Sequence, residues 1–140
     1  MSLIRGRCVL WTVTVNDQKN LILVKSDKKL DFINIQMMLN QIYLENECKC
    51  SWYDRFIDLS CLKEIKGNLG IIRDHIRLYH KMHPLHDDVK FAVYSPFSIF
   101  RSMIEFYKQE AQYSGFKLKI SGSLDECAYF LSVDKALLQS

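Results

Sequence analysis

A regular alternation of short strand-like runs with amphipathic helical segments constrains the fold of this chain most. Five runs rich in β-branched and aromatic residues have the composition typical of strands: residues 8–15, 21–25, 52–59, 89–94 and 116–120. A segment with apolar side chains at helical spacing follows the second strand and each later one. The predicted order is therefore β-β-α-β-α-β-α-β-α. Because strand–helix–strand units favour parallel pairing through right-handed crossovers, we predict one α/β domain with a mixed five-stranded sheet that opens with a β-hairpin.

Spacing and capping signals predict where the four helices lie. The first covers residues 30–45, and the second follows Gly67 and stops before Pro84. Ser95 and Pro96 have the sequence of an N-cap and first helical residue, and that third helix ends at Gly115. A capping box of Ser123 and Glu126 starts the last helix, which runs towards Leu138. The pattern predicts buried strand residues at Phe56, Ile57, Phe91, Val93, Leu118 and Ile120, with Lys117 and Lys119 exposed on a sheet edge.

Composition restricts the class of protein. The chain has 140 residues, of which 49% are hydrophobic and 25% charged, as expected for one globular domain. A net charge of +3 is too small to indicate nucleic-acid binding, and no apolar run is long enough to span a bilayer. The first residues lack the features of a signal peptide, so we expect a cytoplasmic protein with reduced thiols. Cys48 and Cys50 are separated by one residue, unlike the pairs of redox and zinc motifs.

Two parts of the chain resemble a known family. Residues 58–60 close a buried strand, residues 90–95 form the next, and the last helix carries Asp125, Glu126, Ala128, Phe130 and Leu131 in the pattern acidic cap, alanine, aromatic–leucine. In these features residues 8–131 resemble the SpoIIAA-like proteins, relatives of the STAS domains of anti-sigma-factor antagonists. The resemblance implies strands that step one way across the sheet. It also implies a bacterial signalling module that binds a partner kinase or sigma-regulating protein.

The same resemblance points to a regulatory loop after the third strand. The family carries a phosphorylated serine in the segment that corresponds to residues 61–70, where this chain has Ile65-Lys66-Gly67-Asn68-Leu69-Gly70. Lys66 or Gly67 occupies the serine position, and neither can be phosphorylated as an ester. We therefore predict a module without the family's phosphoserine switch, with Ser60 as a weak upstream substitute. A permanent charge on Lys66 would attract an acidic partner surface.

Polar residues near the carboxyl ends of the strands are the candidate ligand-binding or partner-binding residues. The strand ends of open α/β sheets line the ligand crevice, and helix amino termini attract anions. These considerations select Ser60, Asn68 and Ser95, and the family resemblance adds Lys66 and Gly67. A small anionic group or an acidic side chain would bind there. The alternative for Ser95 is that it only caps its helix.

Four histidines lie close together in the sequence and raise the question of a metal site. His80, His83 and His86, with Asp87, carry suitable donor atoms, but no two histidines are four residues apart and Pro84 interrupts the segment. The alternative is a solvated helix end at which cationic side chains oppose the helix dipole. We favour the solvated end and predict neither a metal nor a cofactor.

The sequence shows no catalytic fingerprint. It lacks a Gly-x-Ser-x-Gly elbow and a phosphate-binding glycine loop. We therefore expect a non-enzymatic regulatory module that binds an unidentified protein, with a small-molecule or lipid-binding domain as the alternative. An exposed apolar patch beside the helix that begins at Asn68 would favour the first, and a closed apolar cavity the second.

Overall fold

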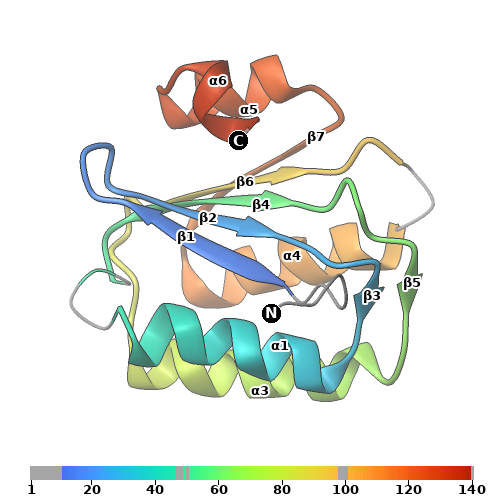
Figure 1. Ribbon diagram of the computed structural model, residues 1–140. Coiled ribbons are helices and arrows are strands. Elements are labelled where there is room, and N and C mark those ends of the chain that lie inside the picture. Colours follow the sequence, from blue (N-terminus) through green and yellow to red (C-terminus); the bar gives the residue numbers. More distant parts are fainter. Residues whose placement is uncertain (1–10, 47–48, 50, 98–100, 140) are drawn as a thin grey trace, which may run out of the picture.

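The structure is a computed structural model that describes residues 11–46, 49, 51–97 and 101–139, without the side chains of 101–103 (Figure 1). Its main sheet has five strands in the order β1-β2-β4-β6-β7. β1 (Thr12–Asn16) pairs antiparallel with β2 (Leu21–Lys25), and β4 (Asp54–Asp58), β6 (Lys90–Tyr94) and β7 (Lys117–Ser121) continue the sheet in parallel. The predicted α/β class, the leading hairpin and the mixed five-stranded sheet are confirmed.

A small second sheet lies between the strands and the helices that follow them. β3 (Lys29–Leu30) pairs in parallel with β5 (Glu64–Ile65). The sequence analysis did not predict these two-residue strands, because they are too short to show a periodic pattern. They fix the segments that lead into the first two crossover helices.

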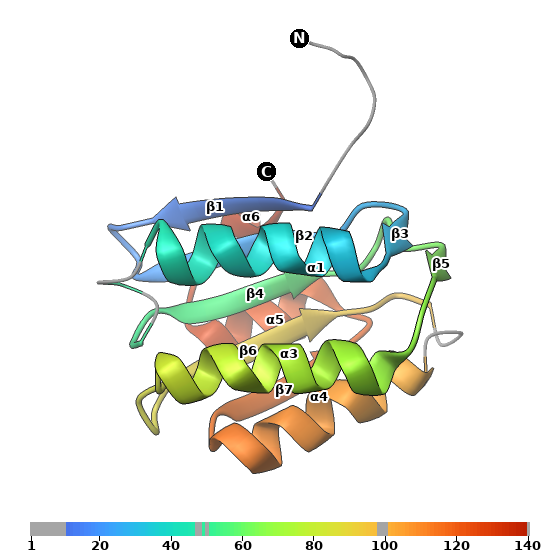
Figure 2. The same cartoon turned by 90° about the horizontal axis from the view of Figure 1, so that it is seen from below.

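The helices form a layer on each face of the sheet. α1 (Phe32–Leu39), which continues as the π-helix η1 (Asn40–Leu44), lies on one face with α3 (Leu69–Met82) and α4 (Arg101–Ser114) (Figures 1 and 2). α5 (Leu124–Leu131) and α6 (Lys135–Leu138) cover the other face. Right-handed crossovers between strands that step one way across the sheet put every crossover helix on the same side. None of the helices within the described ranges is long and apolar enough to cross a membrane.

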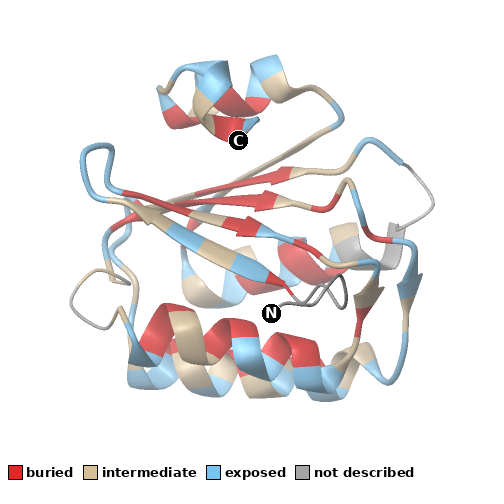
Figure 3. Cartoon of the chain, in the orientation of Figure 1, coloured by how far each residue is buried: buried red, intermediate tan, exposed pale blue. Residues whose placement is uncertain are grey.

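Alternation along the central strands divides the core between these two layers. Ile57 belongs to the cluster under α1, α3 and α4, whereas its neighbour Phe56 belongs to the cluster under α5 and α6. Figure 3 shows the buried residues on the central strands and on the inward sides of the helices. The burial predicted for Phe56, Ile57, Phe91 and Val93 is confirmed.

The edge strand β7 departs from the prediction. Leu118 and Ile120 are only partly buried, because β7 has a strand neighbour on one side alone. Lys117 is exposed as expected, but Lys119 is half-buried and forms a 3.4 Å ion pair with Glu126.

Two predicted helix boundaries are wrong. Pro96 and Phe97 are not helical, and α4 begins at Arg101. Ser95 extends the β6–β7 ladder through its backbone N–H, which donates to the carbonyl of Ser121 at 2.9 Å, so it does not cap a helix. The last predicted helix is broken at Ser132, whose left-handed φ of 60° ends α5 before α6 begins. The predicted first strand is seen as Thr12–Asn16, and residues 8–10 lie outside the described part.

Candidate protein-binding surface

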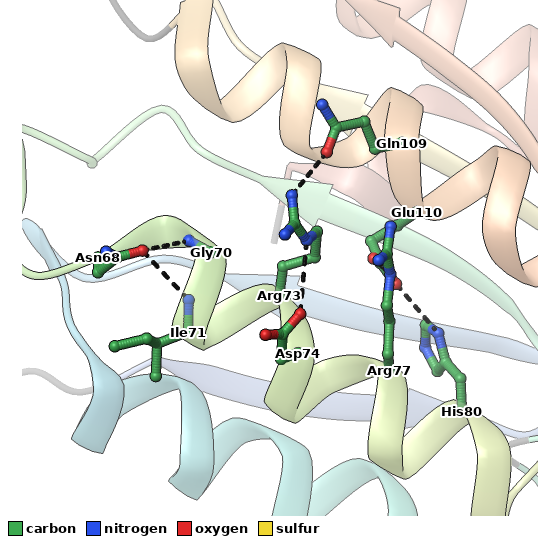
Figure 4. Close-up of polar contacts among 9 residues, drawn as sticks. All are labelled: Asn68, Gly70, Ile71, Arg73, Asp74, Arg77, His80, Gln109 and Glu110. Carbon is green, nitrogen blue, oxygen red and sulfur yellow. Dashed lines mark hydrogen bonds and ion pairs between the residues drawn. The ribbon is translucent and has the colours of Figure 1, made fainter.

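The start of α3 is fixed by its own cap. Gly67 has a φ of +99°, a conformation that favours glycine, and Asn68 follows as the N-cap. The Asn68 side-chain oxygen accepts hydrogen bonds from the N–H groups of Gly70 (2.7 Å) and Ile71 (3.2 Å) (Figure 4). Asn68, a candidate ligand-binding residue, thus uses this oxygen to begin the helix.

Three polar side chains of α3, those of Arg73, Arg77 and His80, contact α4. Arg73 donates to Gln109 at 2.9 Å, and Arg77 donates to the buried carboxylate of Glu110 at 2.7 Å (Figure 4). Nδ1 of His80 lies 2.9 Å from the Ser114 hydroxyl and 3.7 Å from Glu110. These contacts attach α3 to α4. Other residues of α3 therefore form its outward side.

The outward side of α3 carries exposed apolar side chains together with the exposed Asp74 and Lys81, and the neighbouring outer side of α1 is apolar. Exposed large hydrophobic side chains occur at three positions of α3 and four of α1 and η1, each with 40–68% of its surface exposed: Phe32, Ile33, Met37, Leu44, Ile71, Leu78 and Met82. They are seven of the eleven such side chains within the described part of the chain, so they are concentrated on one surface. We call these seven residues the α1–α3 face.

The α1 side of this face has no charged side chain. From Phe32 to Leu44 the sequence contains no Asp, Glu, Lys, Arg or His. A solvent-facing helix normally carries charged residues on its outer side. The outer side of α1 therefore has the composition expected of a surface that is shielded from solvent, although it is exposed in this chain.

A row of rings lies along the seam between the two helices. The rings of Phe32 and His75 are 4.9 Å apart, and those of His75 and Tyr79 are 5.2 Å apart. The Tyr79 hydroxyl donates to the side chain of Asn40 at 2.8 Å, at the start of η1. These contacts join the two stripes into one continuous surface, and Figure 2 shows α1 and α3 side by side.

The five candidate ligand-binding residues lie near one edge of the sheet (Figure 1). The segments that follow β4 and β6 and the start of α3 all lie at that edge (Figure 1). The Ser60 N–H donates to the Asp58 carboxylate at 2.8 Å, and the Ser95 hydroxyl donates to the carbonyl of Phe97 at 3.2 Å. Lys66 and Gly67 belong to the link between β5 and α3. A cavity of about 140 Å³ beside Lys25 and Asp58 includes none of the five predicted residues.

The histidines do not converge. His80 is 8% exposed and packs in the core, so the predicted solvated helix end is wrong for this residue: α4 supplies Ser114 and Glu110 as buried partners. His83 stacks on Tyr43 with ring centroids 5.5 Å apart, and His86 follows in a loop. Across the described ranges no group of three or more His, Cys, Asp or Glu residues is placed to hold a metal ion. Cys48 and Cys50 lie outside those ranges.

The cavity inside the larger core is small. It has a volume of about 50 Å³ and is bordered by apolar side chains together with Tyr43, Arg55, His80 and Glu110. Pockets that hold drug-sized ligands have volumes of roughly 300–1,000 Å³. Tyr107 is another lining residue, and burial raises the pKa of its phenol above the ordinary value.

These features define a three-layer α/β protein with an uncovered apolar helical face. Comparison with protein-family models, with curated proteins and with solved structures finds no match to this chain. The resemblance to SpoIIAA-like proteins stays a prediction from the sequence motifs.

The sequence analysis missed the α1–α3 face, although two signals pointed to it. One is the uncharged segment from Phe32 to Leu44. The other is a second apolar stripe on α3, at Ile71, Leu78 and Met82, beside the stripe of Ile72 and Ile76 that faces the core.

Proposed function

We propose that this chain is a non-enzymatic protein-interaction module of the regulatory SpoIIAA/STAS-like type, and that it binds a partner protein through the α1–α3 face. The concentration of exposed apolar side chains on this face, beside the helix that begins at Asn68, supports the proposal. With about 200 Å² for each fully exposed large side chain, the seven residues present roughly 700 Å². The largest apolar patch on a typical monomer is about 300–600 Å², and a stable interface buries about 800 Å² on each partner.

The alternative, a small-molecule or lipid-binding domain, has less support. It predicts a closed apolar cavity large enough for a ligand, and the cavity in the larger core has a volume of about 50 Å³. The charged and histidine side chains at its border, Arg55, His80 and Glu110, are all buried within the core. We therefore favour the protein-binding module.

Without a phosphorylatable residue at Lys66 and Gly67, the module binds its partner constitutively. The abundance of the partner, or a ligand, would then set how much complex forms. Phosphorylation of Ser60 is the competing route, since a phosphate there would add about −1.5 to −2 charge near the strand ends.

The test uses a double variant of the face and a matched control. Ile33→Asp/Ile71→Asp places two charges on the face, and both positions lie in the first turn of a helix, where an acidic residue is tolerated. The control, Phe97→Asp/Tyr129→Asp, changes two exposed hydrophobic residues that lie outside the α1–α3 face. A protein captured from the native host is purified, and its dissociation constant is measured by calorimetry against each variant.

We expect the partner to bind the wild type and the control equally, and the face variant at least tenfold more weakly. Equal affinity for all three chains would contradict the assignment of the α1–α3 face. Loss of binding in the control alone would place the interface elsewhere.

A further inference from the structure

We infer that the cavity at the amino ends of β4 and β6 binds a neutral sugar, which stacks on the exposed indole of Trp52. The inference goes beyond the proposed function and does not depend on it, because this cavity and the α1–α3 face share no residue. Three features carry it: a cavity of suitable size, an aromatic surface held in a fixed position, and a wall in which positive and negative charges balance.

The cavity has a volume of about 650 Å³, and ligand pockets have volumes of roughly 300–1,000 Å³. Three segments form it: the turn between β1 and β2, the residues that lead into β4, and the loop between α3 and β6. They meet at one edge of the sheet because β2, β4 and β6 are parallel and begin there (Figure 1). This edge is opposite to the one at which Ser60 and Ser95 follow their strands.

Hydrogen bonds hold the three segments together. The Asp54 N–H donates to the carbonyl of Asn20 at 3.0 Å, and the His86 N–H donates to the carbonyl of Ser51 at 2.7 Å. Oδ1 of Asp54 accepts from the backbone N–H of Lys90 at 2.9 Å. The fold itself therefore shapes the cavity, and a ligand would bind without the cost of ordering its walls.

Trp52 provides a flat apolar surface in this wall. It is 47% exposed, and its ring packs against that of Tyr53 with centroids 4.6 Å apart and an interplanar angle of 90°. Tyr53 is buried, and its hydroxyl donates to the Asp17 carboxylate at 2.8 Å. The indole thus lies against a fixed neighbour and is suited to stacking on a flat face of a ligand.

The charges of the wall balance when histidine is counted as neutral. Two lysines and two aspartates line the cavity: Lys19, Lys90, Asp54 and Asp88. Lys117 pairs with Asp88 at 3.6 Å, and the exposed Asp87 adds one negative charge beside them, so these neighbours leave the balance unchanged. An anion would meet the carboxylates and a cation would meet the ammonium groups. The wall therefore favours a neutral ligand.

The polar groups of the wall complement hydroxyl groups. Ammonium groups donate hydrogen bonds, carboxylates accept them, and the Asn20 amide does both. A sugar ring combines hydroxyl groups, which also donate and accept, with an apolar face that would lie on Trp52. A peptide fits less well, because peptide recognition uses several apolar pockets or a free strand edge. Among the described residues that line the cavity, Trp52 is the one exposed large apolar side chain.

The probes are three neutral sugars, glucose, maltose and cellobiose. A glucose phosphate serves as the anionic control, and adenosine serves as a flat neutral ring system of another class. Binding to the full chain is measured by titration calorimetry at millimolar ligand, and tryptophan emission is recorded in parallel. The emission reports on Trp52, because the other tryptophan of the chain, Trp11, is only 3% exposed.

Three variants complete the test. Trp52→Ala removes the aromatic surface, and Lys19→Ala removes one polar group from an exposed turn, where the change leaves the fold intact. Phe97→Ala is the matched control, since Phe97 is 51% exposed and lies outside the cavity. Circular dichroism establishes that each variant is folded, and Lys19→Ala keeps the test decisive if Trp52→Ala does not fold.

We expect at least one of the three sugars to bind the wild type and to shift its tryptophan emission to shorter wavelength. Trp52→Ala should weaken that binding at least tenfold and Lys19→Ala by a smaller factor, whereas Phe97→Ala should leave it unchanged. The glucose phosphate should bind no more tightly than glucose.

Four outcomes would overturn the inference. One is that none of the three sugars binds the folded wild type. Another is that a sugar binds with equal affinity to the wild type and to the folded Trp52→Ala, or to Lys19→Ala where Trp52→Ala does not fold, which would place the sugar elsewhere. Tighter binding of the glucose phosphate than of glucose would show that the cavity selects an anion. Binding of adenosine without binding of any sugar would show that it takes a nucleoside.

Discussion

The guanidinium of Arg77 on α3 donates a 2.7 Å hydrogen bond to the carboxylate of Glu110 on α4, and Glu110 is 2% exposed. The bond joins two helices that are 33 residues apart in the sequence. It also directs a cationic side chain of α3 away from the outer surface, which is where an amphipathic helix would otherwise carry it. The α1–α3 face thus lacks the Arg77 guanidinium because Glu110 of α4 binds it.

Removing the cation of this pair should destabilise the fold strongly. Arg77→Met leaves the Glu110 carboxylate buried without its main partner, and we expect the free energy of unfolding to fall by about 2–4 kcal/mol. Arg73→Met, which removes a more exposed bond to Gln109, should reduce it by less than about 1 kcal/mol. Urea unfolding of both variants measures the difference. Equal effects would show that the Arg77–Glu110 pair is not a major contributor.

The exposed apolar residues should contribute little to folding stability. Ile33→Asp and Ile71→Asp should each change the free energy of unfolding by no more than about 0.5 kcal/mol. Leu39→Ala, on the buried side of α1, should reduce it by about 2–5 kcal/mol. Thermal and urea unfolding provide the comparison. A large loss of stability in either aspartate variant would mean that the side chain supports the fold rather than a partner.

Asn68 should behave as a helix cap. Asn68→Ala removes the acceptor for the Gly70 and Ile71 N–H groups and should lower stability by about 1 kcal/mol, while Asn68→Asp keeps an acceptor and should have little effect. Urea unfolding distinguishes the two variants. Unchanged stability in Asn68→Ala would return this residue to the candidates for ligand binding.

The two described thiols should differ in reactivity. Cys61 is exposed, whereas Cys127 is buried, and burial together with Glu126 raises the pKa of Cys127 to about 11. At pH 8, iodoacetamide should modify Cys61 and leave Cys127 intact, as mass spectrometry of digested protein would show.

The same shift gives a stability prediction with a definite sign. A folded-state pKa above the ordinary value of 9.0 means that the unfolded state loses this proton first as the pH rises. The contribution of Cys127 is therefore complete below pH 9 and declines up to about pH 11. Cys127→Ala should weaken the alkaline loss of stability, and an unchanged pH profile would contradict the assignment.

The charge of Lys66 should matter more for partner binding than the hydroxyl of Ser60. We expect Lys66→Glu to weaken partner binding more than Ser60→Ala, because Lys66 is exposed just before α3, where its positive charge would attract an acidic partner surface. Calorimetry with the captured partner measures both affinities. A stoichiometric phosphate on Ser60, found by intact-mass analysis of protein from the native host, would show instead that a displaced switch operates.

The fold was more predictable from the sequence than the site. Alternation around Phe56 and Ile57 and helical spacing at Ile72 and Ile76 each reflect which neighbours a side chain meets within its own element, so they predict strands and helices correctly. Ser123 illustrates the same point, since its hydroxyl accepts from the Glu126 N–H at 3.3 Å as the capping box predicts. The helix start predicted at Ser95 was wrong because the Ser95 N–H donates instead to the carbonyl of Ser121, which lies 26 residues later in the neighbouring strand β7.

By itself the sequence determined the α/β class, the order of the main elements, the hairpin and the cap at Ser123, because these depend on side chains a few residues apart. Only the tertiary structure decided which apolar side chains stay outside. Ile71 and Ile72 are adjacent and chemically identical, yet Ile72 faces the core while Ile71 lies on the α1–α3 face. In the same way His80 is buried because α4 brings Glu110 and Ser114 to it. The helical period separates the two apolar stripes of α3, but contacts between distant segments decide which stripe packs inward and which stays exposed.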